Sequence, residues 1–177
     1  LTYKNELLTP NISFENASNK GSLNLSGEIP YKNPLVQQDT VIQFYDNPVN
    51  LTLAANNFQV GSFSKLYPAI GSLSGVLKGQ ITAAGTVSNP NLTGSLAVND
   101  GSYYLDLTGM DYNFDLNIST ANSKLVIDKI TLYHTGERQR HFDFTGNVDF
   151  SGMKINDIDL TGTGNLVLLD DYADENQ

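Results

Sequence analysis

The sequence predicts an all-β protein, and three observations lead to that expectation. Apolar and polar residues alternate over most of the chain, turn-forming residues separate the alternating stretches, and helical spacing occurs in a single place. The stretch MDYNFDLNIS, residues 110–119, shows the alternation without a slip. Its apolar residues share one side and its Asp and Asn residues share the other, as in a strand with one buried and one wet face.

Other alternating stretches follow in chain order, and together they predict roughly nine antiparallel strands. They are SLNLSGEI from Ser22, VNLTLAA from Val49, VLKGQITAAGTV from Val76, LTGSLAV from Leu92, YYLDL from Tyr103, KLVIDKITLY from Lys124, HFDFTGNVDF from His141 and IDLTGTGNLVLL from Ile158. Turn signals lie between them, such as SNPN at 88–91 and NDG at 99–101. In KLVIDKITLY the apolar residues change phase, which predicts a bulge near Asp128 or Lys129.

Two segments depart from the strand pattern. In residues 62–70 apolar residues recur at helical spacing after Ser62, which indicates either a short amphipathic helix that plugs an open end of the sheet or an apolar loop. The stretch from Pro30 to Pro48 carries three prolines and weak periodicity. We therefore expect residues 1–48 to form an N-terminal hairpin and a proline-containing connection. Residues 49–177 would form the main curved sheet of the same domain, ending in an acidic tail.

A loose repeat indicates how the strands stack. Glycine, a small polar residue and then Leu or Val recur as GSLNL at Gly21, GSLAV at Gly94, GNVDF at Gly146 and GNLVL at Gly164. Glycine inside a strand commonly marks a bend or a close approach of two backbones. Its recurrence predicts strongly curved strands that stack repetitively, as in a solenoid.

Composition excludes several functions. The 177 residues carry a formal net charge of −9, so the chain lacks the basic footprint of a nucleic-acid binder and would not dock electrostatically on an anionic membrane. There is no cysteine, and no apolar run reaches transmembrane length. The abrupt start at LTYKNELL and the ragged acidic end LLDDYADENQ lead us to expect an excised piece of a longer protein.

No catalytic or metal-binding pattern stands out. His134 and His141 bracket a polar stretch at a spacing that metal sites do not use, and we interpret HTGERQRH as a charged hairpin tip. Its cluster of Arg138, Arg140 and Glu137 is a weaker candidate for contacts with lipid headgroups or a partner. Carboxylates are numerous but lie at polar-face positions, and no spacing selects a catalytic pair. We expect neither enzymatic activity nor a cofactor.

The stretch from Gly71 to Asp170 resembles the TamB/AsmA-like family of envelope proteins. The resemblance rests on GSLSGVLKGQITAAGTVSNPNLTGSLAVNDGSYYL, followed by MDYNFDLNI, KLVIDKITL and HFDFTGNVDF in that succession. It implies an elongated, taco-like sheet whose greasy groove conducts phospholipid between the inner and outer membranes. It also implies a periplasmic location in a diderm bacterium, a parent protein anchored in the inner membrane, and support of outer-membrane biogenesis.

The apolar faces of the strands would line that groove and bind phospholipid acyl chains. The candidate lining residues are Leu96, Val98, Met110, Tyr112, Phe114, Leu116, Ile118, Phe142, Phe144, Val148, Phe150, Ile158, Leu160, Leu166 and Leu168. The resemblance also implies an outer-membrane barrel partner, contacted through other parts of the parent chain. Exposed strand edges predict self-association of the fragment.

The same residues would also suit the sealed core of a closed domain. In that alternative the chain is a β-sandwich or β-solenoid that serves as a binding or structural module of a surface adhesin. Two sheets packed face to face would favour the sandwich, whereas a single curled sheet would favour the groove.

Overall fold

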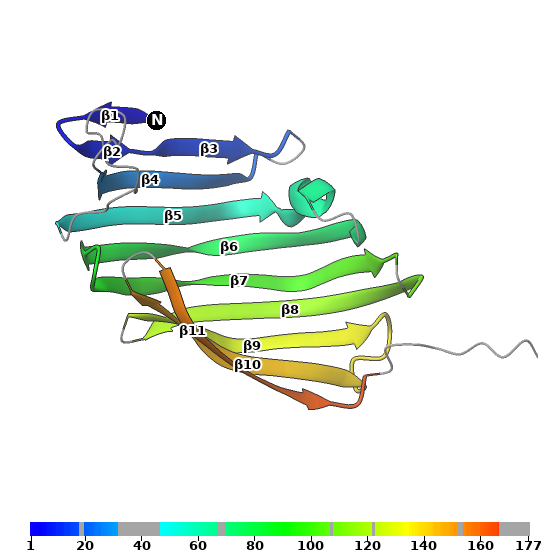
Figure 1. Ribbon diagram of the computed structural model, residues 1–177. Helices are drawn as coiled ribbons and strands as arrows, with labels where there is room; N and C mark the ends of the chain where they lie inside the picture. The colour runs from blue at the N-terminus through cyan, green and yellow to red at the C-terminus, as the bar shows by residue number, and fades with distance from the viewer. Residues whose placement is uncertain are drawn as a thin grey trace, which may run out of the picture.

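The computed structural model describes residues 1–17, 20–31, 47–66, 70–106, 108–121, 123–151 and 154–166. In these residues, eleven strands form one antiparallel sheet accompanied by one short helix (Figure 1). The all-β, antiparallel fold expected from the alternation is therefore confirmed. The described strands make one sheet, not two packed sheets, so they do not form the β-sandwich.

The strands follow one another across the sheet almost in chain order, beginning with β1 (Thr2–Lys4), β2 (Leu7–Thr9), β3 (Asn11–Glu15), β4 (Ser22–Pro30), β5 (Pro48–Gln59) and β6 (Ile70–Thr86). The sheet continues with β7 (Pro90–Leu105), β8 (Met110–Ala121), β9 (Lys124–His134), β10 (His141–Ser151) and β11 (Lys154–Gly164). The exception to this order is that β2 and β3 lie one after the other along the same edge of β4, on either side of Pro10. From β4 to β10 every strand pairs with the strands before and after it in sequence, and β11 pairs with β10.

The residues from Pro30 to Pro48 were predicted to be a connection, and the structure bears on this only at the two ends. Pro30 ends β4 and Pro48 begins β5, and these two strands pair antiparallel. Residues 32–46 between them lie outside the described part of the chain. The division at residue 48 stays a prediction.

Bulges keep the apolar residues on one face of the sheet. Between β8 and β9, Asn117 pairs with Lys129 whereas Ile118 pairs with Ile127, so Asp128 is an extra residue. This is the predicted bulge, and it brings Ile127 and Ile130 to the same face although they are three positions apart. A bulge in β7 does the same for Val98 and Gly101.

The shared face extends across most of the sheet. One row of cross-strand partners runs from Phe58 through Leu77, Val98, Leu116 and Ile130 to Phe144. A second row runs from Leu53 in β5 to Ile81 in β6, on the same face. We call this apolar side the inner face and the opposite side the outer face.

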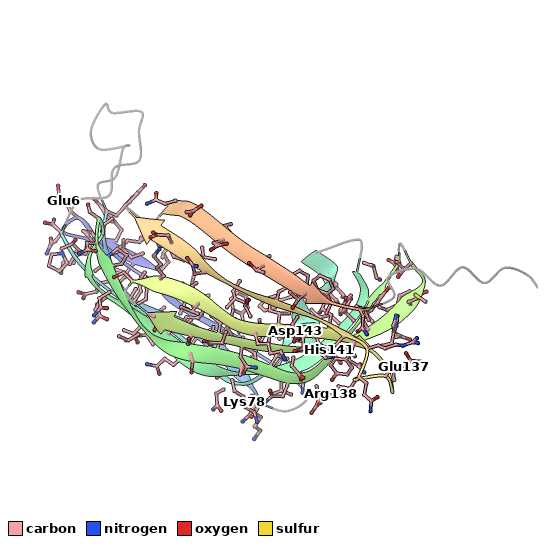
Figure 2. The ribbon with its side chains drawn as sticks, turned by 90° about the horizontal axis from the view of Figure 1, so that it is seen from below. Glu6, Lys78, Glu137, Arg138, His141 and Asp143 are labelled. Atoms are coloured by element: carbon pink, nitrogen blue, oxygen red, sulfur yellow. The ribbon has the colours of Figure 1, made fainter. Side chains whose placement is uncertain are left out.

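The sheet curls toward its inner face. Figure 1 shows β11 crossing in front of the middle strands, and Figure 2 shows the sheet as a curved trough with Lys78 projecting from its convex side. Curling brings β10 back toward β5, because Phe150 and Leu53 line the same hollow although they lie five strands apart in the sheet. The fold is thus an open trough with an apolar inside.

The expected helix near residues 62–70 is a 3-10 helix, η1 (Val60–Leu66), which begins two residues earlier than the predicted segment. Residues 67–69 lie outside the described part of the chain. Figure 1 shows η1 in front of the sheet at the end of β5, on the side that β11 crosses. The helix therefore lies on the inner face at one end of the trough.

Glycines on the inner face make room for aromatic rings of the neighbouring strand. A Cβ atom at Gly101 would lie 2.4 Å from Cζ of Phe114, its direct partner in β8. Gly162 is in the same situation, with a Phe142 ring atom 2.4 Å from the Cβ position. At both places the phenylalanine ring packs directly on the glycine backbone. A large residue on one strand therefore requires a glycine on the next.

We predict that Gly101→Val destabilises the chain by about 1–3 kcal/mol, because the Phe114 ring would have to leave its position over the backbone. Chemical denaturation followed by circular dichroism measures the change. Ala121→Val, an exposed site on β8, serves as the matched control and should shift stability by less than about 0.5 kcal/mol. Equal losses in both variants would mean that the ring does not depend on Gly101.

Candidate functional site

The inner face contains a hollow of ≈ 250 Å³ whose lining is entirely apolar. The residues come from six strands, β5 to β10, so the hollow exists only because the sheet curls. They are Leu51, Leu53, Ile81, Ala83, Pro90, Leu92, Leu96, Ile118, Leu125 and Phe150. No charged or hydrogen-bonding side chain is among them, so the site can hold hydrocarbon but cannot perform acid–base or metal chemistry.

The predicted lining residues that belong to strands all lie on the inner face. The registers align those of β7, β8, β10 and β11 with one another, and three of them (Leu96, Ile118 and Phe150) line the hollow itself. Val98 and Tyr112 are 2% and 1% exposed, so they are filled core positions. The half-buried members are Met110, Phe114, Leu116, Phe142, Phe144 and Val148.

The remaining predicted residues lie at or beyond the β11 edge. Ile158 and Leu160 are 58% and 50% exposed, because β11 has no further strand beside it in the described residues. Leu166 follows the end of β11 and is half-buried, and Leu168 lies outside the described residues. The role of all these residues in holding lipid stays a prediction.

The hollow also includes residues that the sequence analysis did not assign to a lining. Seven come from β5, β6, β7 and β9, among them Leu51, Ile81 and Leu125. Their period-two alternation was visible in VNLTLAA and VLKGQITAAGTV. The alternation assigns a face to each residue, but only the curl of the sheet brings β5 opposite β10.

At the η1 end, aromatic side chains fill the trough. Tyr112 stacks on Tyr103 with ring centroids 5.2 Å apart, and His134 lies 4.8 Å from Tyr112 on its other side. Burial is the main reason that the pKa of Tyr103 is raised, with the nearby Tyr112 adding to it. The Tyr103 hydroxyl thus stays neutral over a wider pH range, as suits an apolar lining.

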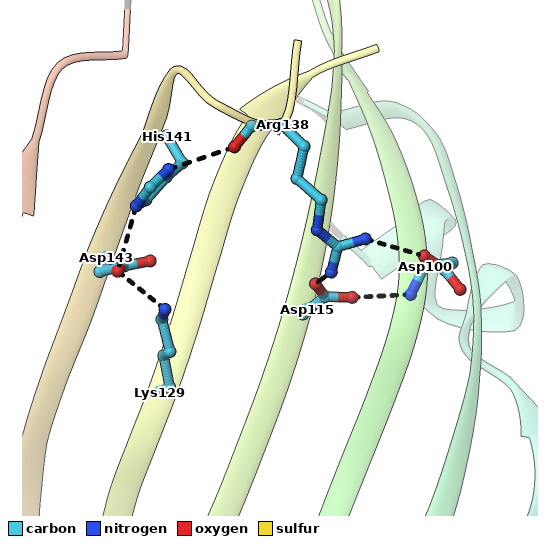
Figure 3. A network of polar contacts seen from close by, with 6 residues as sticks. All are labelled: Asp100, Asp115, Lys129, Arg138, His141 and Asp143. Atoms are coloured by element: carbon cyan, nitrogen blue, oxygen red, sulfur yellow. Dashed lines mark hydrogen bonds and ion pairs between the residues drawn. The ribbon is translucent and has the colours of Figure 1, made fainter. Parts of the chain in front are cut away.

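The outer face carries a polar network that spans four strands (Figure 3). Arg138, from the turn between β9 and β10, reaches back to donate to Asp115 of β8 and, at 3.5 Å, to Asp100 of the β7 bulge. Its guanidinium carbon also lies 4.9 Å above the ring of Tyr133. The Asp100 backbone N–H donates to Asp115 at 2.9 Å. The hairpin tip is therefore tied to the bulge across the intervening strand.

A second part of this network centres on Asp143 of β10. Lys129 Nζ lies 2.9 Å and His141 Nε2 lies 3.4 Å from the same carboxylate oxygen. Partial burial acts to raise the pKa of the Asp143 carboxyl, but hydrogen bonds from Lys129 and Thr131 and the charges of Lys129 and His141 outweigh it. The pKa is therefore lowered from its ordinary value of 3.8.

The two histidines lie on opposite faces of the sheet. His134 packs on Tyr112 at the inner face, whereas His141 points to Asp143 at the outer face. They cannot share a metal ion. Among the described residues, no cluster of three or more His, Asp or Glu side chains is arranged to hold one.

Residues 12–113 match the family model of the TamB C-terminal domain, which is more than half of the chain. The chain belongs to the TamB family. The match begins within β3 and includes β4 and β5, which precede the stretch from Gly71 on which the resemblance rested, and it ends within β8. Searches of curated proteins and of solved structures gave no match.

Membership of the TamB family sets the broad role of this chain. TamB proteins belong to the cell envelope and act in a translocation and assembly module, which is a transport and assembly role and not an enzymatic one. Within the described residues, no helix combines the length and the apolar character that a membrane crossing requires.

We predict that Asp143→Asn makes the TamB-family chain less stable at neutral pH, and that the difference shrinks in acid. Because the pKa of Asp143 is lowered in the folded state, its ionised form stabilises the fold above the ordinary value of 3.8. That stabilisation is lost as the pH falls through the lowered folded pKa. Urea midpoints of both proteins, measured at pH 7 and at about pH 3, provide the test.

Lys129→Met supplies the matching half of a double-mutant cycle, because Lys129 is the strongest contributor that lowers the pKa of Asp143. The double variant should lose less stability at pH 7 than the sum of the two single losses. Strict additivity would show that the two side chains do not interact in solution.

Proposed function

We propose that this chain is a segment of a periplasmic bridge whose trough conducts phospholipid acyl chains between the inner and outer membranes. The observation that carries the proposal is the purely apolar hollow, whose lining comes from β5 on one wall and β9 and β10 on the other. A sealed core would need a second layer over the inner face. In the described residues the sheet instead curls until β10 faces β5, but its two edges do not meet. Apolar residues on β3 and β11 stay exposed.

The energetics of an apolar trough suit transport better than storage. Each methylene moved from water into such a lining gains about 0.8 kcal/mol, so an acyl tail would not leave for water. A bilayer is as apolar as the trough, so transfer from membrane to trough is nearly neutral. A tail can then move along the lining without a deep energy minimum at one place.

The exposed rims of the trough fit a segment of a longer conduit. Ile12 and Phe14 of β3 are 38% and 53% exposed, and Ile155 of β11 is 58% exposed. These side chains are on the inner face, at the two edges of the sheet. Neighbouring segments of a parent protein, or a lipid tail in the trough, would cover them and lower the cost of their exposure.

On the outer face of the described strands, the side chains around the network are polar and offer no comparable site for lipid tails. Lys129, Arg138 and the three aspartates of the network are paired with one another, and the surface around them is polar. A water-facing exterior with a greasy interior is what a periplasmic conduit requires. Support of outer-membrane biogenesis, and contact with a barrel protein, form part of the same proposal through the TamB-family role in assembly.

We predict that Leu92→Asp, at the hollow, abolishes binding of phospholipid by the chain. A carboxylate there would be desolvated by every acyl chain that enters, whereas the sheet keeps its hydrogen bonds. The protein is purified from a diderm bacterium, extracted with organic solvent, and the extract is analysed by lipid mass spectrometry. Wild-type chain should yield phospholipid and Leu92→Asp should yield little.

The matched control is Thr93→Asp, the next residue of β7, whose side chain points to the outer face and is exposed. It introduces the same charge on the same strand and should leave the phospholipid yield unchanged. Wild-type protein free of lipid, or equal loss in both variants with intact circular dichroism, would contradict the groove.

A further inference from the structure

The trough is not uniformly hollow along its length. Leu96 and Ile118 line the hollow, but the next inner-face residue of β7, Val98, is only 2% exposed. Its neighbour in the same row of partners is Leu77, which in turn pairs with Phe58, and Phe58 is 1% exposed. The free space therefore stops where the Val98 row begins.

Two groups of side chains fill the trough at that row and beyond it. On β5, Phe58 contacts Phe63 of η1, with ring centroids 5.4 Å apart. Val60 of the same helix is 8% exposed, and its side chain lies 3.4 Å from the Cβ position of Gly75 in β6. On β7 to β9, the row of Tyr103, Tyr112 and His134 continues the barrier.

The helix is held in place by a residue of the β3–β4 connection. Asn16, beside the β3–β4 turn, is 8% exposed, and its side-chain amide donates to Ser62 Oγ at 3.0 Å and to the Gln59 carbonyl at 3.4 Å. In return, the Gln59 backbone N–H donates to Asn16 Oδ1 at 2.6 Å. The buried side-chain amide of Asn16 thus forms hydrogen bonds both with the end of β5 and with the first turn of η1.

We propose that η1, with Phe58 and Phe63, is a plug that closes the trough next to the hollow, and that Asn16 is its latch. This inference rests on the proposed function, because a plug has a purpose only if acyl chains occupy the hollow. Passage of a chain along the whole trough then requires η1 to move aside. Asn16 governs that step because it joins the helix to the neighbouring strands without contacting the lipid.

The geometry favours movement of η1 over rearrangement of the strands. Opening the sheet would break ladder hydrogen bonds between paired strands, whereas displacement of η1 breaks the few bonds of one short helix and those to Asn16. Short 3-10 helices have poor internal hydrogen-bond geometry, so η1 depends on such outside contacts. The latch is accordingly the part of the structure where a substitution would change passage without removing the trough.

The test places a photo-reactive benzoylphenylalanine at one of two inner-face positions. Leu92 lies in the hollow, and Met110 lies past the plug, two residues before Tyr112. The purified chain is incubated with vesicles of palmitoyl-oleoyl phosphatidylglycerol, irradiated and analysed by mass spectrometry for lipid adducts. With Asn16 present, we expect adducts at position 92 and none at position 110.

Asn16→Ala should produce adducts at position 110 while those at position 92 persist. Asn24→Ala is the matched control, because it removes an amide of the neighbouring strand whose side chain donates to Ser22 Oγ within that strand, at 3.0 Å. It should leave position 110 unlabelled. Ser62→Ala, which removes one latch bond, provides a milder variant if Asn16→Ala loses its sheet signal in circular dichroism.

The possible outcomes test the proposed function and the plug separately. Absence of adducts at both positions in every protein would overturn the proposed function. Adducts at position 92 together with equal labelling of position 110 in the wild-type background would overturn the plug alone. So would failure of Asn16→Ala, Ser62→Ala and Phe63→Ala alike to admit lipid to position 110.

Discussion

A β-strand can turn only every second side chain to one side, and the whole trough depends on keeping that side the same in every strand. Over eleven strands a single slip would expose an apolar row on the outer face. Bulges prevent this wherever the alternation shifts. Ala55 and Phe58, Val98 and Gly101, and Ile127 and Ile130 are each three positions apart, yet each pair shares the inner face. Asn57 and Asp100 provide the positive φ angles, 50° and 52°, that two of these bulges use.

The sequence predicted which residues share a face of each strand, but it did not predict how far the sheet curls. The break in phase within KLVIDKITLY predicted the bulge at Asp128, because apolar residues on both sides of it revealed the shift. NDG at 99–101 was predicted to be a turn between two strands, because it is a typical turn sequence and Gly101 has no side chain to mark its face. That prediction was wrong: these residues form a bulge within the continuous strand β7. The opposition of Leu53 and Phe150 was beyond any local pattern, because it results from the summed curl of several strand pairs.

For the charged residues, the sequence likewise predicted the face of the sheet but not the pairing. The sequence placed the aspartates on the polar face, and the network lies there. It did not show that Arg138 turns back to Asp115 instead of pointing into solvent, because its two carboxylate partners lie 23 and 38 positions earlier in the chain. The helical spacing after Ser62 predicted a short helix, but its role as a plug depends on Asn16, 46 positions away. Long-range polar contacts of this kind leave no periodic signal.

Because each described strand from β5 onward pairs only with its sequence neighbours, this part of the sheet has no pair of distant segments that must find each other before the rest can form. Such a chain can fold by adding one hairpin at a time to an existing edge. It can also change in length during evolution by gain or loss of whole hairpins, since each new hairpin needs to match only one preceding strand. The distance such a protein spans is therefore a variable that selection can tune separately from the architecture of its walls.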